Sequence, residues 1–230
     1  MKKVLLSLTA LLGVVSASYS QSESENTSSD FKRWQIRVRG VGVVPNESAK
    51  IGAIGGDVNI SSVFIPELDF TYFFTKNIAA ELILGTSKHK VNTVGSDLSP
   101  INGPTEANVD LGSVRLLPPT LTVQYHFYPT KDKVFKPYIG AGVNYTIFYD
   151  VKSGVAKDVK YDNKVALALQ AGADLDITDN IFLNIDVKYL FLKTDVTVDA
   201  SNLNGGATLD IPASVKINPL LLGFGVGYRF

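Results

Sequence analysis

Apolar and polar residues alternate with a period of two along most of this chain, and such alternation predicts β-strands. It is clearest in eight segments, at residues 34–44, 63–74, 78–90, 114–128, 136–150, 164–176, 181–196 and 215–230. Most of these segments are long enough to cross a bilayer as tilted strands. The pattern therefore favours an all-β fold with eight long antiparallel strands.

The two faces of the predicted strands differ in chemistry, because successive side chains of a strand point to opposite faces. One face is apolar and uncharged, from Trp34, Ile36 and Val38 in the first segment to Tyr228 and Phe230 in the last. The other face carries Arg37, Arg39, Glu67, Asp69, Glu81, Gln124, His126, Asn144, Gln170, Asp174, Asn184, Asp186, Lys188 and Arg229. Charges within membrane-spanning strands are tolerated only away from lipid. We therefore expect the apolar face to meet lipid and the charged face to line the lumen of a transmembrane β-barrel.

The connections between the segments alternate in length. Residues 75–77, 129–135 and 177–180 are short and polar, whereas residues 45–62, 92–113, 151–163 and 197–214 are longer and rich in Gly, Asn, Asp and Ser. Short periplasmic turns opposite long outer loops are typical of bacterial outer-membrane barrels. Aromatic residues gather near both rims of the apolar face, as a bilayer selects. With eight strands, both termini of the barrel are expected on the periplasmic side.

The beginning of the chain has the pattern of a secretory signal peptide. A short basic stretch at residues 1–3 precedes an apolar run at residues 4–15, and small residues offer cleavage after residue 17 or residue 20. Residues 21–33 are polar and are expected to form a flexible segment. Residues 34–230 are assigned to the barrel, which predicts export to the outer membrane of a Gram-negative bacterium.

Composition narrows the classes of function. The 230 residues fit one all-β domain, and Lys plus Arg and Asp plus Glu both total 22, so the net charge is zero. Without a basic stripe to bind phosphates, nucleic acid is not expected as a partner. Cysteine is absent, which excludes disulfides, thiolate metal ligands and a cysteine nucleophile.

A soluble eight-stranded barrel of the lipocalin type is the alternative fold, with the apolar face turned inward. The strand lengths and the aromatic rims argue against it. A further argument comes from glycines that lie on the same face of their strands as the charged residues: Gly140, Gly142, Gly223, Gly225 and Gly227. Small residues at those positions suit a narrow interior crowded by long polar side chains.

Three stretches of the chain are distinctive: the Leu-Pro-Pro-Thr block at residues 117–120, the Pro-Tyr-Ile-Gly-Ala-Gly block at 137–142, and Gly225 to Phe230. They resemble the OmpW family of small outer-membrane proteins. The similarity extends from about Trp34 to the end. It implies an eight-stranded barrel with a narrow, largely apolar lumen that lets small hydrophobic molecules cross the membrane or leave sideways into it. An aromatic that family members often carry soon after the aspartate opening strand six is missing after Asp162, where Asn163 and Lys164 follow.

The charged face offers candidate lumen-lining residues, and it supports two interpretations. The side chains form either a polar conduction path or ligand cradle, or a network of mutually neutralising pairs that fills the barrel. The candidates are Arg37, Arg39, Glu67, Asp69, Glu81, Gln124, His126, Asn144, Gln170, Asp174, Asp186, Lys188 and Arg229. The sequence does not determine which pairs form.

Leu117, Pro118 and Pro119 form a second candidate site. Two successive prolines withdraw two backbone donors from a strand, which marks an edge, a bend or a bulge. A local opening here would give an apolar solute a lateral exit. The alternative is the start of a strand near the outer rim.

Catalysis and metal binding are not expected. The two histidines, His89 and His126, fall near opposite ends of their strands, and no Gly-x-Ser-x-Gly motif surrounds a serine. No cofactor is predicted. The expected partners are outer-membrane lipid and lipopolysaccharide, small hydrophobic solutes, and the barrel-assembly machinery, which Tyr228 and Phe230 of the last strand would address. A structural or adhesive protein with a plugged lumen, working through its polar outer loops, is the alternative function.

Overall fold

Each of the eight alternating segments forms strand structure in the computed structural model, which describes residues 31–101, 103–129, 134–203 and 205–230. Eight strands form the continuous wall of the barrel: β1 (Trp34–Val44), β4 (Val63–Phe73), β5 (Ile78–Gly85), β8 (Thr120–His126), β9 (Phe135–Lys152), β11 (Lys164–Asp176), β12 (Ile181–Phe191) and β15 (Leu220–Arg229). Every neighbouring pair in this wall is antiparallel, and β15 pairs with β1 to close the barrel. Closure gives every wall strand a hydrogen-bonded neighbour on both sides, which a chain in lipid requires.

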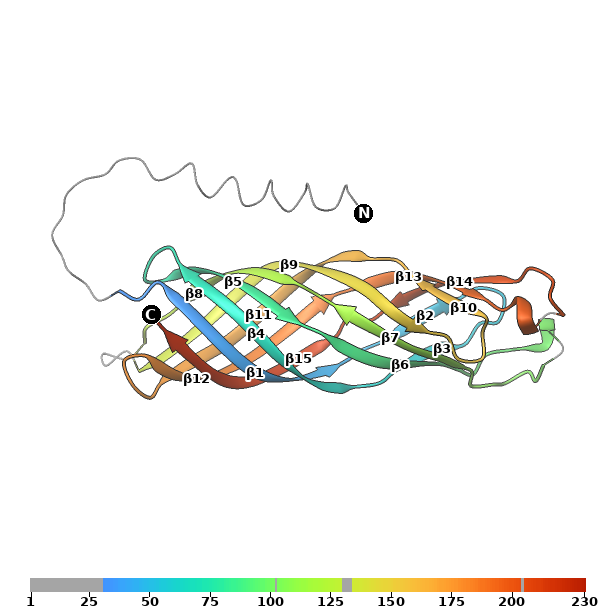
Figure 1. Ribbon diagram of the computed structural model, residues 1–230, viewed down its shortest axis with the longest axis horizontal. Helices are drawn as coiled ribbons and strands as arrows, with labels where there is room; N and C mark the ends of the chain where they lie inside the picture. Colours follow the sequence, from blue (N-terminus) through green and yellow to red (C-terminus); the bar gives the residue numbers. More distant parts are fainter. Residues whose placement is uncertain (1–30, 102, 130–133, 204) are drawn as a thin grey trace, which may run out of the picture. The chain divides into compact units, whose positions relative to one another are not determined.

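The short connections at residues 74–77 and 177–180, the end of β8 and the beginning of β9 lie at one end of the barrel, here called the turn end (Figure 1). Residues 74–77 and 177–180 are tight turns, and the chain between β8 and β9 runs from residue 127 to residue 134. The beginning of β1 and the end of the chain meet at the same end. There Trp34 and Phe230 exchange two backbone hydrogen bonds of 3.0 and 2.9 Å.

At the opposite end, here called the loop end, the wall continues past the predicted strands. Further strands are β2 (Ser48–Ile51), β3 (Asp57–Ile60), β6 (Ser87–Val94), β7 (Asp110–Leu117), β10 (Asp158–Tyr161), β13 (Lys193–Asp199) and β14 (Asp210–Lys216). They pair as β10-β13-β14-β2 and as β3-β6-β7-β9. Two short 3-10 helices, η2 (Ser99–Ile101) and η3 (Ser201–Leu203), lie in the connections.

The prediction of four long loops was therefore wrong in part. The glycines and asparagines of residues 45–62, 92–113, 151–163 and 197–214 suggested loops, but the alternation continues into them. In β13, Thr194, Val196 and Val198 are buried, while Lys193 and Asp195 are exposed. Buried alternate residues and cross-strand pairing hold these segments in the wall.

The outer face carries a continuous set of exposed apolar side chains, here called the apolar band. Val38, Phe64, Val123, Ile139 and Phe224 are examples, and all are more than half exposed. Toward the loop end the outward residues become charged, as at Lys88, Lys90, Lys193 and Lys216. The barrel wall therefore extends beyond the level of the apolar band. None of the helices in the described part of the chain has the length and hydropathy needed to cross a membrane.

Candidate functional site

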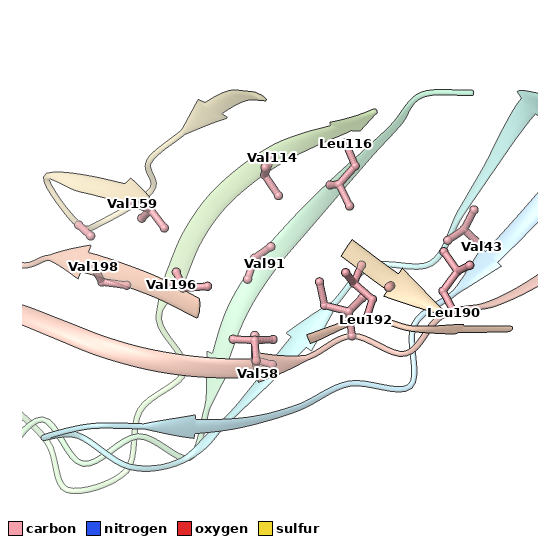
Figure 2. Packing of buried hydrophobic residues seen from close by; sticks show 14 of the residues in the cluster. Val43, Val58, Val91, Val114, Leu116, Val159, Leu190, Leu192, Val196 and Val198 are labelled. Carbon is pink, nitrogen blue, oxygen red and sulfur yellow. The ribbon is translucent and has the colours of Figure 1, made fainter. Parts of the chain in front are cut away.

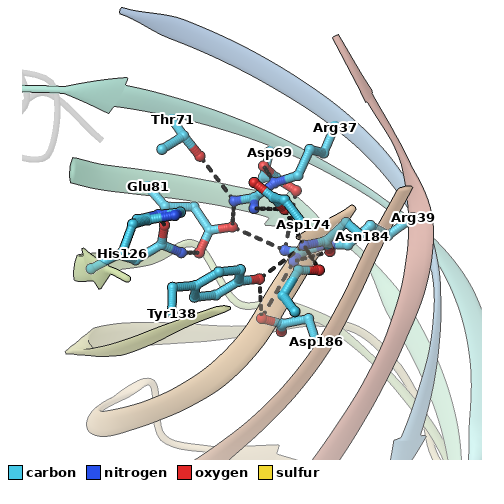
Figure 3. A network of polar contacts seen from close by, with 12 residues as sticks. Arg37, Arg39, Asp69, Thr71, Glu81, His126, Tyr138, Asp174, Asn184 and Asp186 are labelled. Carbon is cyan, nitrogen blue, oxygen red and sulfur yellow. Dashed lines mark hydrogen bonds and ion pairs between the residues drawn. The ribbon is translucent and has the colours of Figure 1, made fainter. Parts of the chain in front are cut away.

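The half of the lumen nearer the turn end holds a set of buried polar side chains, here called the polar network (Figure 3). Alternation places their side chains inside, because β1, β4, β5, β8, β9, β11, β12 and β15 present every second residue to the lumen. The network comprises Arg37, Arg39, Glu67, Asp69, Glu81, Thr122, Gln124, His126, Tyr138, Gln170, Asp174, Asn184, Asp186, Lys188 and Arg229, each no more than 9% exposed.

Arg37, on β1, connects three other strands. Its Nε donates to Asp69 on β4 at 2.6 Å, and its guanidinium also binds Glu81 on β5. A third carboxylate, Asp174 on β11, lies 3.6 Å from Nη1 across the lumen. One cation therefore bridges opposite sides of the barrel, with no exposed surface of its own.

Arg39 repeats this arrangement one step toward the loop end. Its Nη2 lies 2.7 Å from Glu67 and 3.1 Å from Asp69, and its Nη1 lies 3.6 Å from Asp186. Glu81 lies between the two arginines, at 3.2 Å from Arg39. The alternation R-x-R of β1 thus matches acidic residues at the same height on β4, where Arg37 pairs with Asp69 and Arg39 with Glu67.

Glu81 is also a centre of uncharged hydrogen bonds. Its second oxygen accepts from Thr122 at 3.2 Å, from Gln124 at 2.8 Å and from Gln170 at 2.8 Å. Gln170 donates in addition to Asp186 at 2.7 Å. Residues from β5, β8, β11 and β12 are therefore joined across the lumen through one carboxylate.

The charges of the network nearly cancel. Four cations, Arg37, Arg39, Lys188 and Arg229, face five carboxylates. The five are Glu67, Asp69, Glu81, Asp174 and Asp186. Buried charges persist only when paired, and here every one of these groups lies within 4 Å of a partner of opposite sign.

Two predicted lumen-lining residues lie at the edges of this network. The His126 ring lies 4.8 Å from the Phe73 ring and 4.9 Å from the Tyr138 ring, and its Nε2 is 3.0 Å from the Gln124 amide oxygen. Asn144 lies toward the loop end, where its amide donates to Thr120 at 2.8 Å and to the Pro118 carbonyl at 3.1 Å.

The half of the lumen nearer the loop end is an apolar cavity of about 460 Å³ (Figure 2). Its walls come from nearly all strands of the extended barrel and include Val43, Ile65, Val91, Val114, Leu116, Leu190, Leu192, Val196, Val198, Ile211, Val215 and Leu221. The family resemblance implied a largely apolar lumen, but the strand pattern was interpreted only for the polar residues of the inward face and did not predict this cavity. The signal was present: the same parity continues from Arg39 to Val41 and Val43, and from Lys188 to Leu190.

The edge of the polar network nearer the loop end closes the apolar cavity, and we call this edge the floor of the cavity. Glu67 and Lys188 both line it, 3.8 Å apart. Thr120 and Thr146 add two hydroxyl groups. A molecule in the cavity therefore meets apolar walls and a floor that can both donate and accept hydrogen bonds.

Two titratable groups stand in the cavity wall above the level of the apolar band. His89 Nδ1 lies 2.7 Å from the Ser61 carbonyl oxygen and its Nε2 lies 3.0 Å from the Ser87 hydroxyl. Burial lowers the pKa of His89. Tyr161 stacks on Phe148 with ring centroids 5.3 Å apart, and burial raises its pKa to about 12. Both groups are therefore uncharged near neutral pH.

The predicted lateral opening coincides with a gap in the hydrogen-bond ladder. Ile83 pairs with Thr120 and Ser87 pairs with Leu116, so residues 84–86 lie opposite residues 117–119. Pro118 and Pro119 have no N–H, and across this stretch the Thr86 hydroxyl donates to the Leu116 carbonyl at 3.1 Å. We call residues 84–86 and 117–119 the proline seam.

The proline seam lies between the cavity and the apolar band. Gly85 and Pro118 line the cavity, whereas Leu117 is 39% exposed on the outer face. On its other side the same segment stays joined to β9, where the Tyr145 N–H donates to the Pro119 carbonyl at 3.0 Å. At the proline seam, the backbone hydrogen-bond ladder is therefore interrupted between β5–β6 and β7–β8, while β9 stays paired with the same segment.

Within the residues that the structure describes, no three His, Asp or Glu side chains are grouped so as to hold a metal ion. The two histidines have separate surroundings, with His89 beside Ser61 and Ser87 and His126 between Phe73 and Tyr138. Neither is arranged with a serine and a carboxylate as a nucleophile would need.

Comparison with known proteins places this geometry among outer-membrane barrels. Residues 32–230 match the sequence model of the OmpW family. The outer-membrane protein y4mB of Sinorhizobium fredii is 43% identical over 90% of this chain and 84% of its own length. The dibenzothiophene metabolism operon protein PahQ of Pseudomonas aeruginosa is 30% identical over 86% of this chain and 88% of its own length. The crystal structure of OprG from Pseudomonas aeruginosa superposes with a TM-score of 0.75 at 25% identity, covering 86% of this chain and 96% of that one.

Proposed function

Because the chain belongs to the OmpW family of outer-membrane β-barrels, we propose that it gives small hydrophobic molecules a passive route from the cell surface into the outer membrane. The observation that carries this proposal is the apolar cavity, which has a closed polar floor and an interrupted wall at the proline seam. A solute would enter at the loop end, dissolve in the cavity and leave sideways between β5–β6 and β7–β8.

The polar network argues against passage of an apolar solute along the barrel axis. An apolar molecule moving past Arg37 and Glu81 would separate buried ion pairs and leave the charges without partners or water. Separating such a pair costs about 3–5 kcal/mol. The floor of the cavity is therefore the end of the axial path for an apolar solute.

The cavity chemistry supports a small apolar substrate. Its volume of about 460 Å³ lies in the range of sites for single small molecules, and its walls are mainly Val, Leu and Ile. The floor pair Lys188 and Glu67 has no net charge and favours neutral over charged solutes. The name of the relative PahQ refers to dibenzothiophene, an apolar fused-ring compound, which is the same class of molecule.

The proposed orientation puts the turn end in the periplasm and the loop end outside. The short turns, the meeting of both barrel termini at the turn end, and the polar extended wall at the other end support it. In this orientation Tyr228 and Phe230 of β15 are the residues we propose to address the barrel-assembly machinery. The predicted signal peptide, residues 1–20, and most of the flexible segment lie outside the described residues.

The test closes the proline seam reversibly. The chain has no cysteine, so a Gly85→Cys/Pro118→Cys pair, facing across the seam, introduces one controllable disulfide. The barrel is reconstituted into vesicles carrying lipopolysaccharide, and entry of the apolar dye N-phenylnaphthylamine is followed by fluorescence. We expect slow dye entry with the oxidised protein and wild-type entry after reduction.

The control is a Val43→Cys/Leu221→Cys pair, which also faces the cavity but joins two strands that are already fully paired. Its oxidation should leave dye entry unchanged. Equal dye entry through oxidised and reduced Gly85→Cys/Pro118→Cys protein would contradict the lateral route. If wild-type barrels admit no dye, the structural role with a plugged lumen becomes the better assignment.

A further inference from the structure

Four basic side chains project from the outer face of β6, β7 and β9, on the same side of the barrel as the proline seam. Lys88 and Arg115 are directly opposite each other in the register of β6 and β7. One step toward the loop end, Lys90 and Lys152 lie on either side of Ser113. We call these four residues the basic patch.

The basic patch is unusual in a chain whose charges balance overall. Like charges directly opposite each other destabilise a sheet. Arg115 has one acidic neighbour, Asp150, at 3.0 Å. Among the described residues, Lys88, Lys90 and Lys152 have no ion-pair partner, whereas Lys164 elsewhere on the loop end lies 2.9 Å from Asp195. Within ion-pair distance, the four cations of the basic patch therefore share one carboxylate.

The height of the patch relative to the apolar band is its second distinctive feature. Arg115 is two residues along β7 from Leu117, an exposed member of the band. Lys88 follows the exposed Leu84 of β5 by four residues. Arg115 pairs with Tyr149 of β9, which is 39% exposed. The cations therefore lie where the apolar surface ends. In a bilayer this level is occupied by lipid headgroups.

We propose that the basic patch binds the phosphate of a phosphorylated glycolipid of the outer leaflet, whose acyl chains lie on Leu84 and Leu117. The choice of leaflet rests on the orientation given under the proposed function, whereas binding itself is independent of solute transport. A phosphate between Lys88 and Arg115 offsets the like-charge repulsion that the strand register imposes. The lipid then borders the proline seam, since Leu84 and Leu117 belong to both surfaces.

The experiment titrates the detergent-refolded barrel with bisphosphorylated lipid A and measures the retained lipid by native mass spectrometry. A Lys88→Gln/Arg115→Gln variant should bind about 25-fold more weakly, roughly fivefold for each cation removed. The loss should shrink as salt is added, because exposed charges are screened. Dephosphorylated lipid A should bind wild-type protein as weakly as lipid A binds the variant.

The matched control is Lys157→Gln/Lys160→Gln, which removes the same charge from exposed loop-end residues that have acidic neighbours. It should bind lipid A like the wild type. The proposal is overturned if the two double variants bind equally, if removing the phosphates has no effect, or if inorganic phosphate displaces lipid A at equal concentration. Equal binding of phosphatidylglycerol would overturn the assignment to a glycolipid.

Discussion

Arg37 shows how strongly the interior of this barrel depends on single residues. It is fully buried and bound to Asp69 and Glu81, with Asp174 at 3.6 Å. We expect Arg37→Met to destabilise the barrel by about 3–5 kcal/mol, because five buried carboxylates then face only three cations and one buried negative charge more is left uncompensated. Urea unfolding in phospholipid bilayers, followed by the fluorescence of Trp34, the single tryptophan, measures this loss.

Asp69→Asn is the matched comparison, since it removes a charge of the opposite sign from the same pair. Arg37 retains Glu81, and Arg39 retains Glu67 at 2.7 Å. With five carboxylates facing four cations, losing one carboxylate also balances the network. Asp69→Asn should therefore cost clearly less than Arg37→Met. An equal or larger loss would contradict the view that cations limit the stability of the network.

His89 gives the barrel a pH dependence that can be isolated. Its pKa is lowered in the folded protein by burial, so below about pH 6.5 the unfolded chain takes up the proton more readily. The free energy of unfolding should therefore fall as the pH drops from about 6.5 toward the lowered pKa of His89. Below that pKa, His89 should cause no further change in stability. His89→Gln should remove this component when urea unfolding is compared at pH 7.5 and pH 5. A constant difference between variant and wild type at both pH values would refute it.

At the scale of elements, the sequence predicted the eight wall strands but not how far they extend. Alternation in residues 34–44 and 164–176 identified strands with the observed boundaries, because one face of each strand is apolar and the other carries polar or small residues. In residues 197–214 the glycines and asparagines around Asn202 and Gly205 outweighed the alternation that continues through Val198 and Ile211. Turn-forming composition and strand periodicity compete there, and cross-strand pairing of β13 with β14 decides the outcome.

Amide hydrogen exchange tests this pairing beyond the apolar band. The amides of β13 and β14 belong to a four-stranded sheet, whereas residues 205–207 between them form a turn and a bend. We expect the paired amides around Val196 and Val198 to exchange far more slowly than those of Gly205 and Gly206. Mass spectrometry of peptides from the folded barrel in lipid resolves the two regions. Equally fast exchange throughout residues 193–216 would show that the wall ends at the apolar band.

At the scale of the whole molecule, the lumen combines two environments that the sequence only partly revealed. The charged residues were predicted from parity, but their pairing was not, because partners such as Arg37 and Asp174 come from strands far apart in the sequence. The apolar cavity depends in addition on the extended wall, since Val196, Ile211 and Val215 belong to it. Only closure of all the strands brings these side chains to one space.

Glu81 determines whether this arrangement blocks ions as well as apolar solutes. It joins Arg37, Arg39, Gln124 and Gln170 across the lumen, so the intact barrel should conduct very little current in a planar bilayer. Glu81→Ala removes the central side chain and leaves four cations with four carboxylates, so the barrel should still fold.

We expect the current through Glu81→Ala barrels to rise several-fold, while entry of N-phenylnaphthylamine stays as in the wild type, because the seam is untouched. Asp110→Ala, at the exposed start of β7, makes the same change in charge outside the lumen and should leave the current unchanged. A large current through wild-type barrels would mean that ions pass the polar network. The dye and the ions would then share an axial path, and the lateral route would lose its physical basis.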